Sequence, residues 1–330
     1  MTRQHYETYL SQGFELRLKP GDEQSNEIAA GKLVSKTARH DIVDGIPRFV
    51  PSQNYADNFG LQWNSFKSTQ LDSFSGLSKS ADRFWANTGW SRTELAGKTV
   101  LEIGCGAGRF TEILLLAGAQ VVAVDYSNAV DANLRNNSTK GDLFLLQGDL
   151  YALPFPDDCF DFVFCFGVLQ HTPDPTRAYK ANFKKLRPGG KLSMDCYRKR
   201  RVPTPWSTPK YLWRPITSRL APEKLLTIIR WYVPRYLPVD TFLRRLPGIG
   251  SLVVAMIPVP CWNYVDAGLT ADQRREWAIM DTFDALGAAY DQPHTLKEIQ
   301  GMIRSSENEC EEVFYGSNGI VANITKRPRL

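Results

Sequence analysis

The residues best placed to do chemistry are three glycines and a carboxylate near the end of a predicted strand. Residues 99–111 read Thr-Val-Leu-Glu-Ile-Gly-Cys-Gly-Ala-Gly-Arg-Phe-Thr, with Gly104, Gly106 and Gly108 at alternate positions. Apolar residues precede the glycines and a dense apolar run follows them, so the pattern predicts a strand, a tight turn and a buried helix. This order is typical of a nucleotide site at the carboxyl end of a parallel strand. Glu102 lies in the predicted strand, where an ionised carboxylate needs a cationic or hydrogen-bonding partner.

Two more carboxylates stand at the ends of the next two predicted strands. Residues 119–127 form an apolar strand that ends in Asp125, and residues 143–150 form another that ends in Asp149. Asp125 follows the glycines by about 20 residues, where a carboxylate can accept hydrogen bonds from both ribose hydroxyls. The alternative is that Asp125 or Ser127 caps a helix.

The same acids argue against a dinucleotide ligand. A pyrophosphate prefers a free helix N-terminus with a cation nearby. The sequence also lacks the third glycine of a Gly-x-Gly-x-x-Gly motif, because position 109 is arginine. Hydride transfer is therefore the weaker hypothesis.

The block Val-Leu-Glu-Ile-Gly-Cys-Gly-Ala-Gly-Arg-Phe-Thr resembles the first motif of class I S-adenosylmethionine-dependent methyltransferases, and the resemblance extends along residues 97–197 and again at the C-terminal end. It implies an α/β fold: a doubly wound, seven-stranded, mostly parallel Rossmann-like sheet with an antiparallel C-terminal hairpin. The implied cofactor is S-adenosylmethionine, with S-adenosylhomocysteine as product and no metal. This cofactor has no phosphate and carries a sulfonium and an ammonium group, so acids near it are favourable. The resemblance assigns the following residues to its site: Glu102, Gly104, Cys105, Gly106, Gly108, Arg109, Asp125, Tyr126, Asp149, Leu150 and Phe166.

Within that family, Glu102 faces the methionine end of the cofactor, directly or through backbone and water contacts. Asp149 accepts from the adenine amino group, and Leu150 packs near the ring. The pattern Leu-Pro-Phe-Pro-Asp-x-x-Phe-Asp at 153–161 is similar to that of small-molecule methyltransferases of the ubiquinone-biosynthesis type. The Asn/Asp-Pro-Pro-Tyr/Phe signature is absent, which argues against adenine in DNA or glutamine as the target.

His171 follows the fourth predicted strand and is a candidate general base, because imidazole titrates near neutral pH. The alternative is that it caps the helix beginning near Pro173. Further candidates on the substrate side are Asp281, Asp284, Tyr290 and His294. The two aspartates are three residues apart, so a helix would place both on one face.

Residues 1–50 are predicted to form a small β-rich unit with a turn at Asp44-Gly45. The unit resembles the zinc-ribbon-like unit that precedes some methyltransferase domains. It lacks the cysteines of that unit, and His5 and His40 alone cannot make a tetrahedral site. We therefore expect no metal there.

Residues 51–96 are predicted to be a mostly helical lead-in. One interpretation is an amphipathic element that packs on the sheet. In related methyltransferases such helices cap the cofactor, which would bring four further residues to its pocket: Tyr55, Phe59, Gln62 and Trp63.

The core at 97–197 is followed by a mostly helical lid or substrate insertion at 198–294, and 295–330 supply a final helix and hairpin. Between 198 and 245, twelve Lys and Arg residues stand against two acids, Glu223 and Asp240, among many aromatic residues. Three interpretations remain open. The insertion could contact an anionic membrane or a lipid-linked substrate, bind RNA, or form a lid or dimer interface in which Arg stems cover apolar neighbours.

The composition is that of an ordinary globular protein. Among 330 residues, 40 Lys and Arg and 35 Asp and Glu give a net charge of +5, too small to indicate a nucleic-acid partner. Six cysteines occur without a Cys-x-x-Cys pair, as is typical of a reducing compartment. There is no signal-peptide pattern, and no run reaches the roughly 18–20 apolar residues of a spanning helix. We expect a cytoplasmic protein, either free or peripheral at the inner membrane face.

The sequence thus predicts an S-adenosylmethionine-dependent methyltransferase. The favoured reaction is in-line O-methylation of a small molecule or of a saccharide, free or lipid-linked, with the protein positioning the two reactants. The alternatives are a non-catalytic S-adenosylmethionine-binding subunit of a complex and an RNA methyltransferase.

Overall fold

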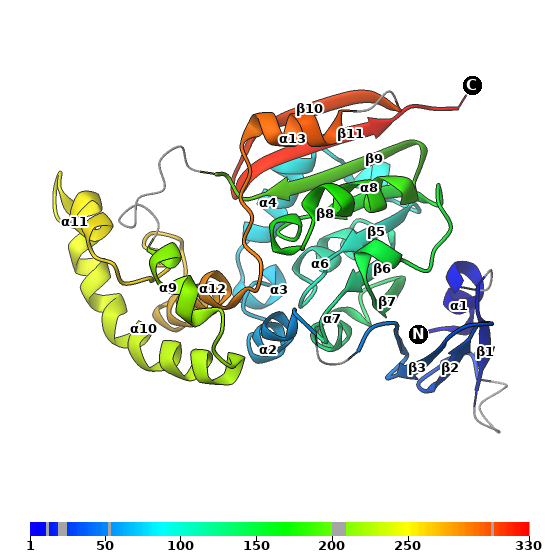
Figure 1. Ribbon diagram of the computed structural model, residues 1–330, viewed down its shortest axis with the longest axis horizontal. Helices are drawn as coiled ribbons and strands as arrows, with labels where there is room; N and C mark the ends of the chain where they lie inside the picture. The colour runs from blue at the N-terminus through cyan, green and yellow to red at the C-terminus, as the bar shows by residue number, and fades with distance from the viewer. Residues whose placement is uncertain (11–12, 19–24, 52–53, 200–208, 305–306, 330) are drawn as a thin grey trace.

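The computed structural model describes residues 1–10, 13–18, 25–51, 54–199, 209–304 and 307–329. Within these residues, eleven strands form one sheet in the order β1-β2-β3-β4-β7-β6-β5-β8-β9-β11-β10 (Figure 1). Its centre is five parallel strands: β5 (Thr99–Ile103), β6 (Gln120–Asp125), β7 (Leu143–Gln147), β8 (Phe160–Cys165) and β9 (Leu186–Cys196). Strands β5 to β8 are mostly apolar and buried, as expected for a sheet covered on both faces.

The register of the central strands positions the predicted strand-end residues. Ile103 of β5 pairs with Val124 of β6, so the glycine turn and Asp125 leave the sheet at the same edge. Asp125 in turn pairs with Gln147, which places Asp149 just beyond the end of β7. Because parallel strands end at one edge, all three groups converge there.

The predicted count of seven strands is too small for this sheet. The seven predicted core strands are present, and the predicted C-terminal hairpin is β10 (Asn308–Gly316) with β11 (Gly319–Lys326). The N-terminal unit, however, extends the sheet with β1 (Glu15–Arg17), β2 (Gly31–Val34), β3 (Arg39–Val43) and β4 (Ile46–Arg48). The link is a parallel pairing of β4 with β7, in which Phe49 N donates to Gln147 O at 2.8 Å. Without the N-terminal unit, β7 would be the edge strand of the core sheet. The free backbone groups of such an edge favour the addition of another strand.

The N-terminal unit also contains a helix that the sequence reasoning did not include, α1 (Arg3–Leu10). Its Tyr6 is buried and donates to Gly45 O at 2.7 Å, and its Tyr9 ring stacks on Phe144 of the core. Asp44 and Gly45 both have positive φ, at 51° and 74°, as a two-residue hairpin turn requires. The unit therefore packs on the core by apolar contacts.

Helices cover both faces of the sheet (Figure 1). One face packs against α4 (Lys79–Thr88), α5 (Arg92–Leu95), α6 (Arg109–Leu116) and α7 (Val130–Asn137). The other packs against α1, α8 (Pro175–Lys185) and α13 (Leu296–Ile303). Thr295 and Glu298 form a capping box at the start of α13, as predicted. The doubly wound arrangement leaves the strand ends free for a site.

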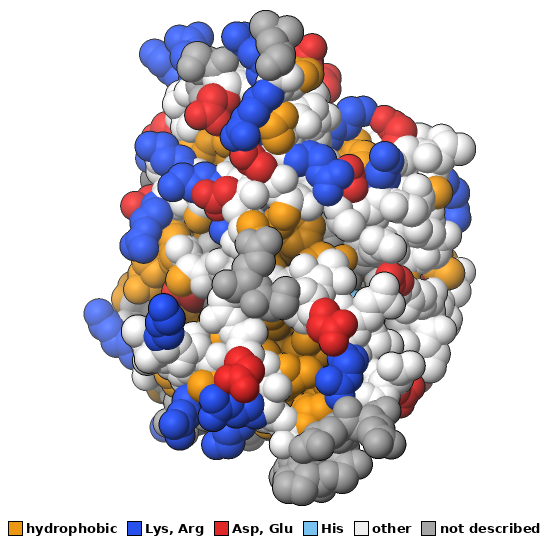
Figure 2. Space-filling view, turned by 90° about the vertical axis from the view of Figure 1, so that its right-hand side faces the viewer, with side chains coloured by type: hydrophobic (Ala, Val, Ile, Leu, Met, Phe, Trp, Pro, Cys, Tyr) orange, Lys and Arg blue, Asp and Glu red, His pale blue; other side chains and the backbone are white. Residues whose placement is uncertain are grey.

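Four further helices form a lid beyond the carboxyl ends of the strands, at the left of Figure 1. We use "lid" for α9 (Lys210–Thr217), α10 (Pro222–Arg244), α11 (Gly250–Met256) and α12 (Ala271–Gly287). A separate apolar cluster joins α10 and α12 to the region of α2 (Asp57–Ser65), with Ile229, Val233 and Phe283 fully buried. None of the helices in the described part of the chain combines the length and the apolar character needed to cross a bilayer. Figure 2 views the opposite end of the molecule, where Lys and Arg side chains lie among Asp and Glu.

Candidate functional site

The glycine turn joins β5 to α6 through three residues with left-handed backbone. The φ angles are 69° at Gly104, 51° at Gly106 and 89° at Gly108, a region that side chains disfavour. A Cβ at Gly104 would lie 2.2 Å from Val168 Cγ2, and one at Gly106 would lie 3.1 Å from Trp63 Nε1. The turn therefore needs glycine for both its dihedrals and its close packing.

Asp125 at the end of β6 is fixed against this turn. Its Oδ2 accepts from Gly106 N at 2.9 Å, and its Oδ1 accepts from Ser127 N at 2.9 Å and from Ser127 Oγ at 2.7 Å. Burial raises the pKa of Asp125 above its usual range. Asp149 is held in a similar way, because its Oδ1 accepts from Tyr151 N at 2.9 Å. Both aspartates line a cavity and keep acceptor capacity toward it.

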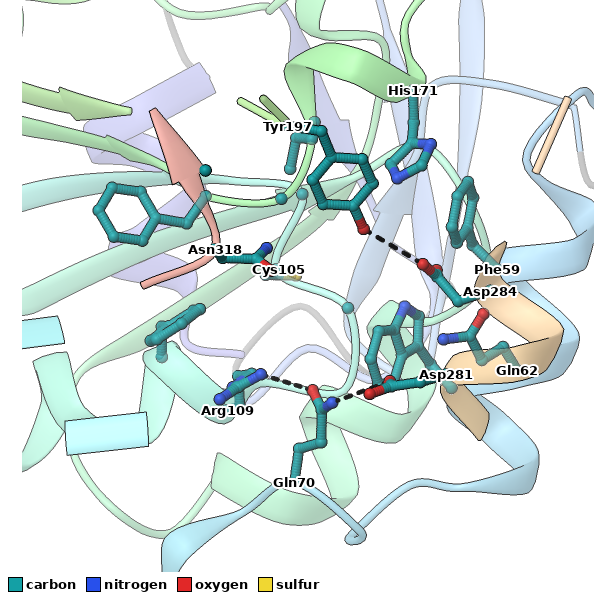
Figure 3. A pocket seen from close by; sticks show the side chains of 18 of the residues that line it. Phe59, Gln62, Gln70, Cys105, Arg109, His171, Tyr197, Asp281, Asp284 and Asn318 are labelled. Atoms are coloured by element: carbon teal, nitrogen blue, oxygen red, sulfur yellow. Dashed lines mark hydrogen bonds between the residues drawn. The ribbon is translucent and has the colours of Figure 1, made fainter. Parts of the chain in front are cut away.

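The cavity has a volume of about 1800 Å³ and lies between the strand ends and the lid (Figure 3). Residues from the glycine turn, the ends of β6, β7 and β8, the lead-in, α9, α12 and the β10–β11 turn all line it. Of the residues assigned to the cofactor by resemblance, these line the cavity: Gly104, Cys105, Gly106, Arg109, Asp125, Tyr126, Asp149, Leu150 and Phe166. The four lead-in residues Tyr55, Phe59, Gln62 and Trp63 also line it.

Glu102 and Gly108 lie behind the turn, outside this lining. Glu102 is 1% exposed and accepts from Thr111 Oγ1 at 2.5 Å. Burial, and to a smaller extent the charge of Asp125, raise the pKa of Glu102 to about 8. Gly108 packs on Asn133, whose Oδ1 would be 2.3 Å from an added Cβ. These two residues therefore support the turn from behind.

The lead-in covers the cavity from the side of α2. The Tyr55 ring stacks on Tyr126 with 4.8 Å between centroids, and Trp63 lies over Gly106. Gln62 is 1% exposed, and its Oε1 has no hydrogen-bond partner among the described residues. A buried acceptor of this kind is unfavourable unless a ligand donates to it.

Two carboxylates of α12 face the cavity from the lid (Figure 3). Asp281 accepts from the Tyr264 hydroxyl, and its Oδ1 lies 3.4 Å from Gln70 Nε2. The other end of the Gln70 amide accepts from Arg109 Nη1 at 2.7 Å. Burial and then the neighbouring Asp284 raise the pKa of Asp281 to about 8. The chain Arg109–Gln70–Asp281 thus connects the helix after the glycine turn to the lid.

Asp284 completes this pair. Its Oδ2 lies 3.4 Å from the Tyr197 hydroxyl, which donates to it. Burial raises the pKa of Tyr197 well above its usual range, with Asp284 as the next largest cause. Tyr197 therefore keeps its proton and serves as a hydrogen-bond donor inside the cavity.

His171 lies just beyond β8 and lines the cavity. Its Nδ1 is 2.8 Å from the Tyr290 carbonyl oxygen, which can only accept, so Nδ1 carries the hydrogen. Nε2 is left as an acceptor and has no hydrogen-bond partner among the residues that the structure describes. The alternative of a helix cap is wrong, because Asp174 caps α8 by accepting from Arg177 N at 2.9 Å.

The structure does not bring the side chains of Tyr290 and His294 into the cavity lining. Tyr290 contributes its carbonyl to His171, and its ring meets Tyr55 edge to face. His294 Nδ1 lies 3.3 Å from Cys196 Sγ, and its backbone N donates to Tyr197 O at 2.8 Å. Both residues lie where they position other residues of the wall.

Several lining residues were missed by the sequence reasoning. Tyr197 directly follows β9, so the strand-end rule could have found it. Gln70 and Arg83 carry no sequence signal, and only the folded chain brings them to the cavity. Arg83 Nη2 is 2.5 Å from Asp195 Oδ2 and lies near the Phe166 ring. Within the described residues, no three His, Cys, Asp or Glu side chains are grouped in a way that could hold a metal ion.

Comparison with known proteins covers the same region. Residues 101–194 match the family described as "Methyltransferase domain". The ubiquinone biosynthesis O-methyltransferase of Xanthomonas euvesicatoria pv. vesicatoria is 32% identical over 151 residues, which cover 40% of this chain and 62% of that protein. The enzyme of the same name from Pseudomonas putida strain F1 is 32% identical over 105 residues, which cover 31% of this chain and 45% of that protein. This chain therefore spans less than two thirds of the length of these curated relatives.

Solved structures show similarity at lower identity. A putative S-adenosylmethionine-dependent methyltransferase from Methanococcus maripaludis is 14% identical with a TM-score of 0.43, over 85% of this chain and 98% of that one. The N-methyltransferase NodS from Bradyrhizobium japonicum, in complex with S-adenosylhomocysteine, is 22% identical with a TM-score of 0.32, over 36% and 61%. Residues 101–194, which hold the glycine turn and both strand-end aspartates, are the part of the chain that matches the methyltransferase-domain family.

Proposed function

We propose that this protein transfers the methyl group of S-adenosylmethionine to a hydroxyl group of a small molecule or of a saccharide, either free or lipid-linked. The observation that carries the proposal is that one cavity joins two sets of groups. The glycine turn, Asp125 and Asp149 line one side, and His171 with the carboxylates of α12 lines the other. The groups proposed to bind the cofactor and a set of hydrogen-bond acceptors for the second reactant therefore line one cavity.

The cofactor side fits S-adenosylmethionine by its donor and acceptor chemistry. The cofactor offers ribose hydroxyls, an adenine amino group and an ammonium group as donors, and it supplies an electrophilic methyl on a sulfonium. Asp125 and Asp149 present carboxylate acceptors, and Gln62 Oε1 is an acceptor without a partner among the described residues. Gly104 and Gly106 allow a ligand to approach the backbone. No phosphate-binding cation is needed for such a ligand.

The acceptor side fits a hydroxylated molecule. Typical ligand pockets hold about 300–1,000 Å³, so a cavity of about 1800 Å³ has room for a second reactant beside the cofactor. Trp262, Tyr264 and Trp277 supply ring surfaces for a sugar or an aromatic ring. Asp281 and Asp284 can accept hydrogen bonds from its hydroxyls.

We assign proton removal to His171. A hydroxyl nucleophile needs a base when it attacks, and a positioned base typically contributes 10²–10⁴-fold in rate. His171 Nε2 is an acceptor because Nδ1 donates to the Tyr290 carbonyl. Tyr197 donates to Asp284, which holds that carboxylate in place to orient the acceptor. Closure by the lid would exclude water from both reactants.

The lipid-linked form of this proposal is supported by α9. Lys210 and Tyr211 line the cavity, while Leu212, Trp213 and Ile216 of the same helix are exposed. A wall that is apolar on the outside and polar on the inside suits a headgroup that stays joined to its lipid. On this form, the protein would act at the inner face of a membrane.

Calorimetric titration tests the cofactor side first. S-adenosylmethionine and S-adenosylhomocysteine should each bind one to one, and Asp125→Ala should weaken binding by about 1–3 kcal/mol, the value of charge-assisted hydrogen bonds. Asp272→Ala is the matched control, because Asp272 is exposed on the lid. Absence of binding by the folded wild type would overturn the proposal.

Transfer of a labelled methyl to a panel of hydroxylated acceptors tests the second half. We expect transfer to at least one alcohol or phenol and loss of that transfer with His171→Ala. Tight cofactor binding with no transfer to any acceptor would instead favour a non-catalytic cofactor-binding subunit.

A further inference from the structure

Exposed apolar side chains are concentrated in the lid. Large hydrophobic side chains that are exposed singly are normal, whereas gathered ones mark interaction surfaces. Outside the lid, the described residues expose only Val43, Phe74, Leu116 and Tyr315. The exposed ones in the lid, counting Ile249 directly before α11, are Tyr211, Leu212, Trp213, Ile216, Ile228, Trp231, Val239, Phe242, Ile249, Leu252 and Met256.

On α10 these side chains share one face. The spacing of three, four, seven or eight residues places Ile228, Trp231, Val239 and Phe242 along a single stripe of the helix. Lys224 and Arg235 fall on the same stripe and are exposed. We call these residues, Lys224, Ile228, Trp231, Arg235, Val239 and Phe242, the outer stripe.

The opposite face of α10 is buried, so the outer stripe is not part of the core. Leu225, Ile229 and Val233 pack into the lid cluster with α12. In contrast, Trp231 is 63% exposed and Phe242 is 67% exposed. Figure 1 shows α10 as a curved helix along the outer edge of the molecule, with α9 and α12 on its inner side. The stripe therefore faces away from the protein.

The charge around the stripe is positive. Arg219, Lys224, Arg230, Arg235 and Arg245 are exposed on and beside α10. Of the two acids in this region, Asp240 is 1% exposed and accepts from Arg244 Nε at 2.6 Å, so it presents no charge to an outside partner. Glu223 remains exposed at the start of the helix.

We propose that the outer stripe of α10 docks on the surface of an anionic phospholipid bilayer. The helix would lie in the plane of the interface with its apolar residues at the headgroup boundary. Trp231 is of the type that prefers this boundary, and the stems of Lys224 and Arg235 can lie along apolar surface while their charges reach lipid phosphates.

Charge favours a bilayer over a second copy of this chain. In a twofold dimer the same patch meets itself, so Lys224 and Arg235 would face a stripe that again contains cations and no acid. Anionic headgroups give each cation a partner, and each Lys or Arg near the surface raises the affinity for the bilayer on the order of fivefold. This docking does not depend on methyl transfer. If the bilayer also holds a lipid-anchored acceptor that the lid leads to the cavity, that further step rests on the proposed function.

Flotation of the full chain with vesicles tests the proposal. Vesicles of phosphatidylcholine with about one third phosphatidylglycerol should carry the protein at low salt, and pure phosphatidylcholine should carry at least tenfold less. The double variant Lys224→Gln with Arg235→Gln should lose about 25-fold on the anionic vesicles, as two contributions of about fivefold predict. Trp231→Ser with Phe242→Ser should lose at least tenfold on them.

The matched control is Phe74→Ser with Leu116→Ser, because these side chains are 57% and 60% exposed outside the lid. The control should float like the wild type. Failure of the wild type to float, or an equal loss in the control, would overturn the proposal. It would also be overturned if sedimentation velocity showed a dimer that Trp231→Ser with Phe242→Ser dissociates while no variant binds vesicles. Cofactor titration of each variant reports folding and keeps this outcome separate from that of the proposed function.

Discussion

The two sides of the cavity are built in different ways. The glycine side comes from one continuous part of the chain, in which Gly104, Asp125 and Asp149 each follow a strand of the same parallel sheet. The lid side depends on contacts between distant segments, such as Gln70 with Asp281 and Tyr197 with Asp284. Position at a strand end thus fixes the first side through the backbone, whereas the second side exists only after side chains of separate helices meet.

The largest effect should come from the proton acceptor on the lid-facing side. His171→Ala should lower the turnover of methyl transfer by about 10²–10⁴-fold, because the acceptor hydroxyl loses its base. The affinity for S-adenosylmethionine should stay within about twofold. His294→Ala is the control, since His294 lies outside the cavity lining, and an equal loss with that variant would argue against a special role of His171.

The next effect concerns how α9 is attached. Lys210 Nζ lies 2.7 Å from Asp291 Oδ2, and both side chains are largely buried. Lys210→Met should therefore lower the free energy of unfolding by about 3 kcal/mol, which is the lower end of the range for breaking a buried ion pair. Arg214 at 3.7 Å retains part of the pairing. Both variants are measured by urea unfolding. The control is the exposed pair of Lys199 with Glu298, for which Lys199→Met should lower the free energy of unfolding by only about 0–1 kcal/mol. Equal costs would show that the buried pair does not anchor α9.

A smaller effect tests the backbone of the glycine side. Gly104→Ala adds a left-handed alanine and a contact with Val168, whereas Gly89→Ala adds a left-handed alanine with nothing near it. Thermal or urea unfolding should therefore show Gly104→Ala to be less stable than Gly89→Ala by about 1–3 kcal/mol, the usual cost of overpacking. Similar values for both would mean that Val168 moves aside without cost.

A further effect is a pH dependence of stability without cofactor. The folded protein holds a proton on Glu102 up to about pH 8, while the unfolded chain loses it near the ordinary value of 4.5. The native state therefore binds more protons between these values, and the free energy of unfolding should fall as pH rises through that window. Glu102→Gln should flatten this slope, as should Asp281→Asn on the lid side. An unchanged slope in both variants would contradict these raised pKa values.

Some features of the fold and of the candidate site follow from local sequence patterns, and others do not. Gly104, Asp125 and Asp149 could be assigned because alternation of strand and helix fixes where strands end. For Glu102 the sequence left open a direct or an indirect contact with the cofactor, and in the fold its side chain accepts from Thr111 behind the glycine turn, so any contact would be indirect. Tyr290 and His294 follow α12 in sequence, and their backbone groups bond to His171 and Tyr197, but their side chains are not part of the cavity lining. The pairing of β4 with β7 depends on an open sheet edge, which no local pattern reveals.

The place of β11 in the sheet has a consequence for synthesis. β11 is hydrogen-bonded to β9 on one side and to β10 on the other, yet it is made well over a hundred residues after β9. At 5–20 residues per second, a ribosome needs roughly 6–24 s to add this intervening stretch. During that time the edge of β9 has no strand beside it, and unpaired edges are the places where nascent chains aggregate. Fast translation between codons 197 and 319, or a holding chaperone, should therefore raise the yield of folded protein.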